Sequence, residues 1–127
     1  MRPSDFILNS DYLSIAQTGR NTFTLTIGGG TLPVNGYSEQ NLDFPINAVT
    51  GAIDRIMISK DSGDYRLGSI MTAYPNNDVR CDVAVYRNAS NTLRARVILQ
   101  NYSGGTATYP SMTFGIKVST FMPPNVF

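Results

Sequence analysis

The segment 79–102 decides the fold, because it reads as two strands joined by a short connection. Its first arm is Val79-Arg80-Cys81-Asp82-Val83-Ala84-Val85-Tyr86-Arg87, and its second is Thr92-Leu93-Arg94-Ala95-Arg96-Val97-Ile98-Leu99-Gln100. Apolar side chains recur at every second position, which is the pattern of a strand with one buried face. We therefore predict a β-hairpin with two buried rows: Val79, Cys81, Val83 and Val85 on one arm, and Leu93, Ala95, Val97 and Leu99 on the other.

The register of this hairpin is restricted by parity. Both apolar rows must face the same core, so the numbers of directly paired residues must have an even sum. A sum of 178 pairs Asp82 with Arg96, and a sum of 180 pairs Tyr86 with Arg94. An odd sum would turn one apolar row toward solvent, because a one-residue slip flips a strand. We therefore expect a connection of three or five residues rather than two or four.

The opposite face of the hairpin is polar, and it is our first candidate for an interaction surface. Eight of the ten basic residues of the chain are Arg, and Arg is enriched at protein interfaces where Lys is depleted. The alternative is a solvated face with cross-strand ion pairs such as Asp82 with Arg96. The candidate interface residues on this face are Arg80, Asp82, Tyr86, Arg94 and Arg96.

Further strand patterns occur along most of the chain and define the fold class. They lie at 12–16, 22–27, 42–46, 53–59, 65–74 and 112–118, separated by turn-forming residues, and no segment sustains helical spacing. The segment 65–74 has apolar residues on both faces, as in a strand that is covered on both sides. We predict one all-β domain over 1–127, an antiparallel β-sandwich or jelly roll of about 7–9 strands with terminal arms at about 1–11 and 119–127.

The composition argues against an enzyme. The chain contains no His and one Cys, which removes the usual nucleophile arrangements and zinc ligand sets. Cys81 lies in an apolar row and is expected to be a buried thiol. Asp54, Asp61 and Asp64 could form a catalytic pair or a calcium loop, but a solvated turn explains them more simply.

Nucleotide binding, nucleic-acid binding and membrane insertion are not expected either. The sequence Gly28-Gly29-Gly30-Thr31 follows a strand but lacks the Lys of a phosphate loop. Ten basic and nine acidic residues nearly cancel, unlike the basic excess of nucleic-acid-binding proteins. No apolar window is long enough to span a bilayer. We expect no cofactor and no metal, with synthesis in a cytoplasm.

The C-terminal segment is the second candidate for an interaction surface. It places large apolar side chains among two prolines, and exposed apolar surface of this kind is typical of contact sites. We expect it to dock on its own body or, preferably, on a neighbouring subunit. The candidate residues are Phe121, Met122, Pro123, Pro124, Val126 and Phe127.

Two stretches resemble known proteins. The opening Arg2-Pro3-Ser4-Asp5-Phe6-Ile7-Leu8-Asn9-Ser10-Asp11-Tyr12-Leu13 and the closing Val118-Ser119-Thr120-Phe121-Met122-Pro123-Pro124 are similar to small proteins encoded among the structural genes of tailed bacteriophages and prophages. The resemblance implies a small all-β virion component, either a head-decoration (cement) protein or a tail-associated protein, without catalytic residues.

The expected function is therefore that of a non-enzymatic virion structural protein. Its partners would be further copies of itself, a trimer being one such homo-oligomer, and other virion proteins such as capsid or tail proteins. The alternative is a carbohydrate-binding or receptor-binding β-sandwich module, which would place a glycan on exposed aromatic rings. The tyrosines available for this role are Tyr37, Tyr65, Tyr74, Tyr86, Tyr102 and Tyr109.

Overall fold

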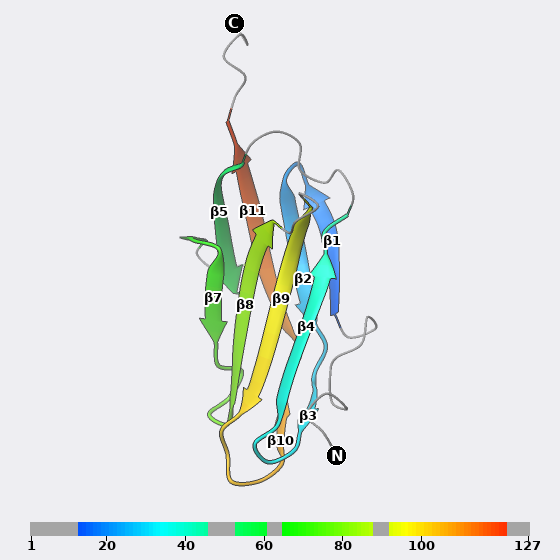
Figure 1. The fold of residues 1–127 in the computed structure, drawn as a ribbon, viewed down its shortest axis with the longest axis vertical. Helices are drawn as coiled ribbons and strands as arrows, with labels where there is room; N and C mark the ends of the chain where they lie inside the picture. The colour runs from blue at the N-terminus through cyan, green and yellow to red at the C-terminus, as the bar shows by residue number, and fades with distance from the viewer. Residues whose placement is uncertain (1–12, 46–52, 61–64, 88–91, 122–127) are drawn as a thin grey trace, which may run out of the picture.

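The strands of the computed structural model form two antiparallel sheets that face each other, with a small third sheet at one end (Figure 1). The structure describes residues 13–45, 53–60, 65–87 and 92–121, and within these ranges it contains eleven strands and no helix. The predicted all-β antiparallel sandwich is confirmed, whereas the strand order does not show a jelly roll. The strands outnumber the predicted seven to nine because several are only two to four residues long.

The first layer is a five-stranded sheet. Its β2 strand alternates threonines with Phe23, Leu25 and Ile27, and these three apolar side chains are fully buried. This is the predicted pattern of one buried and one outward face. The order across the sheet is β1 (Leu13–Gly19), β2 (Thr22–Ile27), β11 (Met112–Thr120), β5 (Ile53–Lys60) and β6 (Arg66–Leu67).

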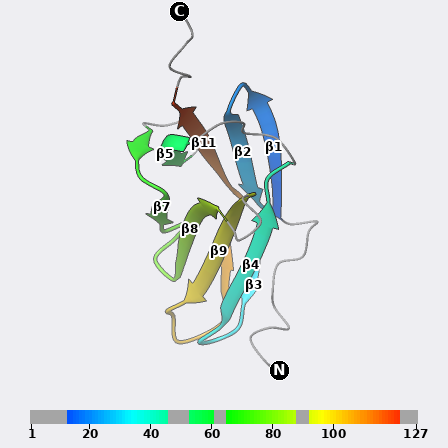
Figure 2. The same cartoon turned by 45° about the horizontal axis from the view of Figure 1, so that its top comes forward.

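The second layer is a four-stranded sheet, which Figure 2 shows in front of β1, β2 and β11. Its two central strands, β9 and β8, are the predicted hairpin, and the order is β4 (Tyr37–Asp43), β9 (Leu93–Asn101), β8 (Val79–Arg87) and β7 (Ile70–Ala73). The third sheet lies at the lower end of Figure 1 and pairs β10 (Ala107–Tyr109) with β3 (Gly30–Leu32).

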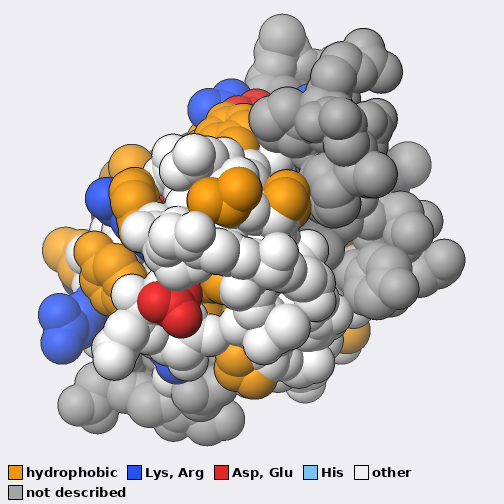
Figure 3. All heavy atoms as spheres, turned by 90° about the horizontal axis from the view of Figure 1, so that it is seen from below, with side chains coloured by type: hydrophobic (Ala, Val, Ile, Leu, Met, Phe, Trp, Pro, Cys, Tyr) orange, Lys and Arg blue, Asp and Glu red, His pale blue; other side chains and the backbone are white. Residues whose placement is uncertain are grey.

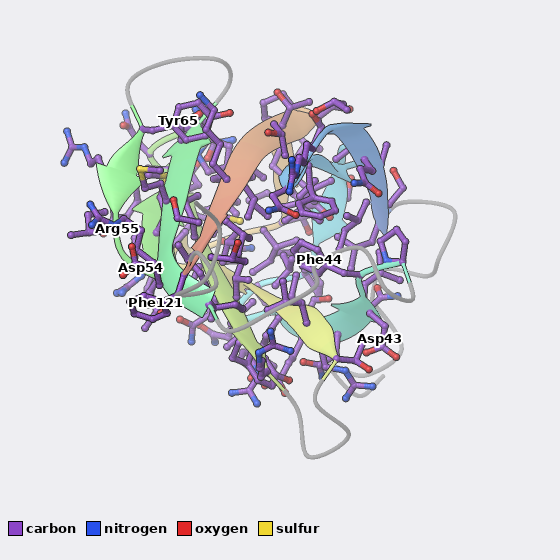
Figure 4. The ribbon with its side chains drawn as sticks, turned by 90° about the horizontal axis from the view of Figure 1, so that it is seen from above. Asp43, Phe44, Asp54, Arg55, Tyr65 and Phe121 are labelled. Atoms are coloured by element: carbon purple, nitrogen blue, oxygen red, sulfur yellow. The ribbon has the colours of Figure 1, made fainter. Side chains whose placement is uncertain are left out.

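The hydrophobic core fills the space between the two layers. All eight predicted apolar residues of the hairpin are buried in it. The rings of Phe23 and Phe44 meet edge to face with their centroids 4.9 Å apart, and the view from above shows Phe44 between the sheets (Figure 4). Since the inner faces supply the core, the outer faces are left for contacts with other molecules.

The register of the hairpin agrees with the parity prediction. Val85 pairs with Ala95 and Arg87 pairs with Leu93, so paired residue numbers sum to 180. Five residues, 88–92, connect the last paired residues. With this sum Asp82 lies opposite Ile98 and Arg96 opposite Ala84, so the suggested direct pairing of Asp82 with Arg96 is wrong.

The segment 65–74 differs from the single, doubly covered strand that we predicted. Gly68, with a φ of 140°, separates it into β6 and β7, which belong to different sheets. A residue at such a φ is strained unless it is Gly. Leu67 and Ile70 are each 71% exposed, so their apolar character does not indicate burial.

Three other features of the strands also differ from the prediction. β4 covers Tyr37–Asp43 rather than 42–46, and it lies at the edge of its sheet. The three-residue strands β3 and β10 were not predicted, because three residues carry too little alternation to detect. Ser119 and Thr120, assigned above to a terminal arm, pair with Arg55 and Ile53 as part of β11.

Two asparagines organise the loops at the lower end. The buried Asn101 amide donates to the carbonyl oxygens of Leu32, Pro33 and Gly105 at 3.2, 2.8 and 2.9 Å. Asn76 donates to the Thr108 carbonyl at 2.6 Å, and its side-chain oxygen accepts from the backbone N–H of Val79 at 3.1 Å. Buried polar groups satisfied in this way hold loops in one arrangement.

Candidate interaction surface

The outward side of the four-stranded sheet, which we call the outer face, carries every predicted interface residue of the hairpin. Successive side chains of a strand alternate between faces, so the residues opposite to the buried rows gather here. The antiparallel registers align four strands of such residues. The outer face consists of Tyr37, Glu39, Asn41 and Asp43 from β4, Arg94, Arg96, Ile98 and Gln100 from β9, Arg80, Asp82, Ala84 and Tyr86 from β8, and Ile70 and Thr72 from β7.

The upper part of the outer face is an ion-paired network between β4 and β9. Arg94 Nε lies 2.7 Å from Asp43 Oδ1, and the two residues are directly opposite in the register. The hydrogen bond with Asp43 raises the pKa of the Arg94 guanidinium, and Tyr86 raises it further. Arg96 Nε lies 3.9 Å from Glu39 Oε2, so both arginines of β9 face carboxylates of β4.

Tyr86 connects this network to β8. Its hydroxyl donates to Asn41 Oδ1 at 3.1 Å, and the Arg96 guanidinium carbon lies 5.4 Å from the centroid of its ring. A guanidinium over an aromatic ring at this distance is a cation–π contact. Tyr86 is therefore held from two sides, and its orientation is set before any partner binds.

The lower part of the outer face has a third ion pair, within β8. Arg80 Nε lies 3.1 Å from Asp82 Oδ2, and Thr72 Oγ1 donates to Asp82 Oδ1 at 2.5 Å. The Asp82 carboxylate thus has its partners in Thr72 of β7 and Arg80 of β8 rather than in Arg96. Three arginines and three carboxylates balance on the outer face, so it carries hydrogen-bonding groups without a net charge.

The contribution of β4 was not recognised from the sequence. Its inward positions are Ser38, Gln40 and Leu42, so only one of three is apolar and the alternation is weak. Glu39 consequently lay outside the predicted strand 42–46, and Asp43 within it was not recognised as an acceptor. A usable signal was the spacing of Tyr37, Glu39 and Asp43, which alternate with those positions over seven residues.

The second candidate surface is described only at its first residue. Phe121 follows the last paired residue of β11 and is 61% exposed. The remaining candidates, Met122, Pro123, Pro124, Val126 and Phe127, lie outside the described residues. Thr120, which precedes Phe121, pairs with Ile53, so Phe121 lies near Asp54 and Arg55, and Figure 4 shows the three residues on the same side of the molecule.

Of the residues considered for chemistry, the structure describes Cys81 and Asp54. Cys81 is fully buried, and its burial raises the pKa of the thiol to about 12, with Asp82 also raising it. Asp54 contacts Arg55 at 3.3 Å on the surface, while Asp61 and Asp64 lie outside the described residues. Within the described ranges, no cluster of His, Cys, Asp and Glu is placed to hold a metal ion.

Two clefts lie where β5 and β6 approach β7, and the second of them reaches the β7 edge of the outer face. One has a volume of about 580 Å³ and is lined by residues 53–56 and 67–69. The other, of about 540 Å³, is lined by Lys60, Arg66, Leu67 and residues 70–72. Binding sites for small molecules combine an apolar hollow with a few convergent polar groups, and the polar side chains that line the first cleft are Ser69 and the Asp54–Arg55 pair.

Comparisons with known proteins found no relative of the chain. No family model, no curated protein and no solved structure matches the chain. The part of the chain that the structure describes also contains no helix able to cross a membrane.

Proposed function

We propose that this protein is a non-enzymatic structural component of a bacteriophage virion, a head-decoration (cement) or tail-associated protein that acts through protein–protein contacts. The observation that carries the proposal is the outer face, where Arg94 and Arg96 are paired with carboxylates of the same sheet and Tyr86 is bonded to Asn41. Arg and Tyr are the residue types that dominate binding energy at protein interfaces. The resemblance of the chain to small phage-encoded proteins supplies the setting.

The ion pairs support this role because they reduce the cost of association. A flexible Arg loses side-chain entropy when a partner immobilises it. Arg94 and Arg96 are already bound to Asp43 and Glu39, and Tyr86 is bound to Asn41. A partner that meets this face therefore finds oriented donors, and the balanced charges avoid repulsion between two copies of the protein.

The test compares association of the wild-type protein with that of the double variant R94A/R96A. We expect the wild type to be a homo-oligomer by light scattering and to be present in purified virions, and the double variant to lose both properties. R55A is the matched control, because it removes an exposed, carboxylate-paired Arg from the other sheet. A wild-type protein that is monomeric and absent from virions would refute the proposal, as would a double variant that assembles normally.

A further inference from the structure

The lower end of the outer face holds a cluster that the ion-paired network does not use. We call it the tyrosine patch, and it consists of Tyr37, Tyr74, Arg80, Gln100 and Tyr102. Gln100 lies directly opposite Tyr37 on one side and Arg80 on the other. Tyr74 directly follows β7, whose last residue, Ala73, pairs with Cys81 beside Arg80. Tyr102 lies two residues beyond Gln100, and the patch thus crosses all four strands.

The aromatic rings of the patch are accessible, while its polar atoms are oriented. Tyr74 and Tyr102 are 64% and 61% exposed. The Tyr102 hydroxyl donates to Gln100 Oε1 at 2.8 Å, and the Tyr37 hydroxyl donates to Glu39 Oε1 at 2.6 Å. The hydrogen bond with Asp82 raises the pKa of the Arg80 guanidinium, so Arg80 keeps its charge beside these rings.

The backbone beneath the patch is held by the loops of the lower end. The N–H of Tyr102 donates to the Asp78 carbonyl at 2.8 Å, and the N–H of Asp78 donates to Asn76 Oδ1 at 2.9 Å. Asn101, next to Tyr102, is bonded to three carbonyl oxygens. The loops that carry Tyr74 and Tyr102 are therefore connected to each other. Because they are already ordered, they lose little conformational entropy when a ligand binds.

The charged groups in and beside the patch are already paired, which favours a neutral ligand. Arg80 is paired with Asp82, and Glu39, which binds Tyr37, faces Arg96. Seen from below, this end of the molecule shows few charged side chains, and its hydrophobic side chains form separate groups rather than one continuous area (Figure 3). An apolar protein partner would favour a continuous area, and a nucleic acid would require a basic excess.

We propose that the tyrosine patch binds a neutral oligosaccharide. Sugar rings present apolar C–H faces, which stack on exposed aromatic rings, and hydroxyl groups, which the amide of Gln100 and the guanidinium of Arg80 can bind. Three strand spacings separate Tyr37 from Tyr74, a span of about 14 Å, which suits several linked sugars rather than one. This site lies at the lower end of the same outer face, whereas the virion contacts tested above are those of Arg94 and Arg96 at its upper end.

The experiment screens the full-length protein against immobilised neutral oligomers of glucose, galactose, mannose and N-acetylglucosamine, together with sialylated glycans. Positive glycans are then titrated into labelled protein by NMR. We expect a neutral oligomer to bind and to shift the backbone resonances of residues 74, 80, 100 and 102. Y74A and Y102A should each weaken binding about tenfold.

The matched control is Y65A, which removes a tyrosine from the outer face of the other sheet, where Lys117 Nζ lies 4.2 Å from its ring centroid. It should bind the same oligomer as the wild type does. The proposal is overturned if no neutral oligomer binds, if only the sialylated glycans bind, or if Y74A and Y102A bind normally. Because both variants retain Arg94 and Arg96, oligomerisation and virion incorporation remain unchanged, and failure here is distinguishable from failure of the virion proposal.

Discussion

At the scale of a single residue, the position of Cys81 on a strand decides its chemistry. The side chain points into the core from β8 and has no exposed surface. Burial removes the solvation of a thiolate, so the neutral thiol is strongly preferred. The sequence was sufficient for this conclusion, because Cys81 occupies the apolar row of an alternating strand.

The raised pKa of Cys81 predicts a loss of stability in alkali. Its folded value of about 12 lies above the ordinary value of 9.0, so the stabilisation is complete below about pH 9 and is lost as the pH rises toward 12. Urea unfolding of the wild type should show a steeper decline than C81A, by up to about 1.4 kcal/mol per pH unit. Parallel curves for the two proteins would contradict the assigned pKa.

At the scale of the elements, Asn101 joins segments that are far apart in the chain. It ends β9 and donates to carbonyl oxygens at the end of β3 and before β10, and its own side-chain oxygen accepts from the Ser103 N–H at 2.8 Å. Backbone carbonyls that lose such a donor while buried remain unsatisfied. One side chain thus secures the lower end of the sandwich and the tyrosine patch above it.

Replacing Asn101 by Ala should therefore destabilise the whole protein. We expect a loss of at least about 2 kcal/mol in the free energy of unfolding, because several polar atoms lose their partners together. The measurement is chemical denaturation, with T106A, an exposed change in the same loop, as the control that should stay within about 0.5 kcal/mol of the wild type. Equal stability of N101A and T106A would show that water replaces the amide.

At the scale of the whole molecule, the fold separates core formation from contact formation. The two sheets bury their inner faces against each other. The buried residues of the hairpin and of β11 all precede the C-terminal segment in the sequence. Among the described residues, Val118 is the last in the core, and Thr120 is the last paired residue of β11. The core residues that the structure describes therefore all precede Phe121.

Removal of residues 122–127 should leave the fold intact and weaken association. We expect the melting temperature of the shortened protein to stay within about 2 °C of the wild type, because no described core contact is lost. Light scattering over a range of concentrations should show fewer oligomers. A large drop in melting temperature would assign the segment to the fold instead, and unchanged oligomers would remove it from the interface.

The sequence predicted the central hairpin more accurately than the strands around it. The strand pair 79–87 and 93–101, its buried rows and its odd-length connection follow from alternation and parity alone. The segment 65–74 was misjudged, because Leu67 and Ile70 are apolar but exposed. Periodicity reports the environment of a strand, and it fails where edge strands leave apolar side chains in solvent.

By itself the sequence determined the all-β class, the faces of the central hairpin and the burial of Cys81, because these depend on neighbours within one strand. Only the tertiary structure decided that Asp43 and Glu39 receive Arg94 and Arg96, and that Tyr37, Tyr74 and Tyr102 gather on one face. These contacts join residues about 30 to 60 positions apart in the chain. The order of strands across a sheet sets such contacts, and no local pattern in the sequence encodes that order.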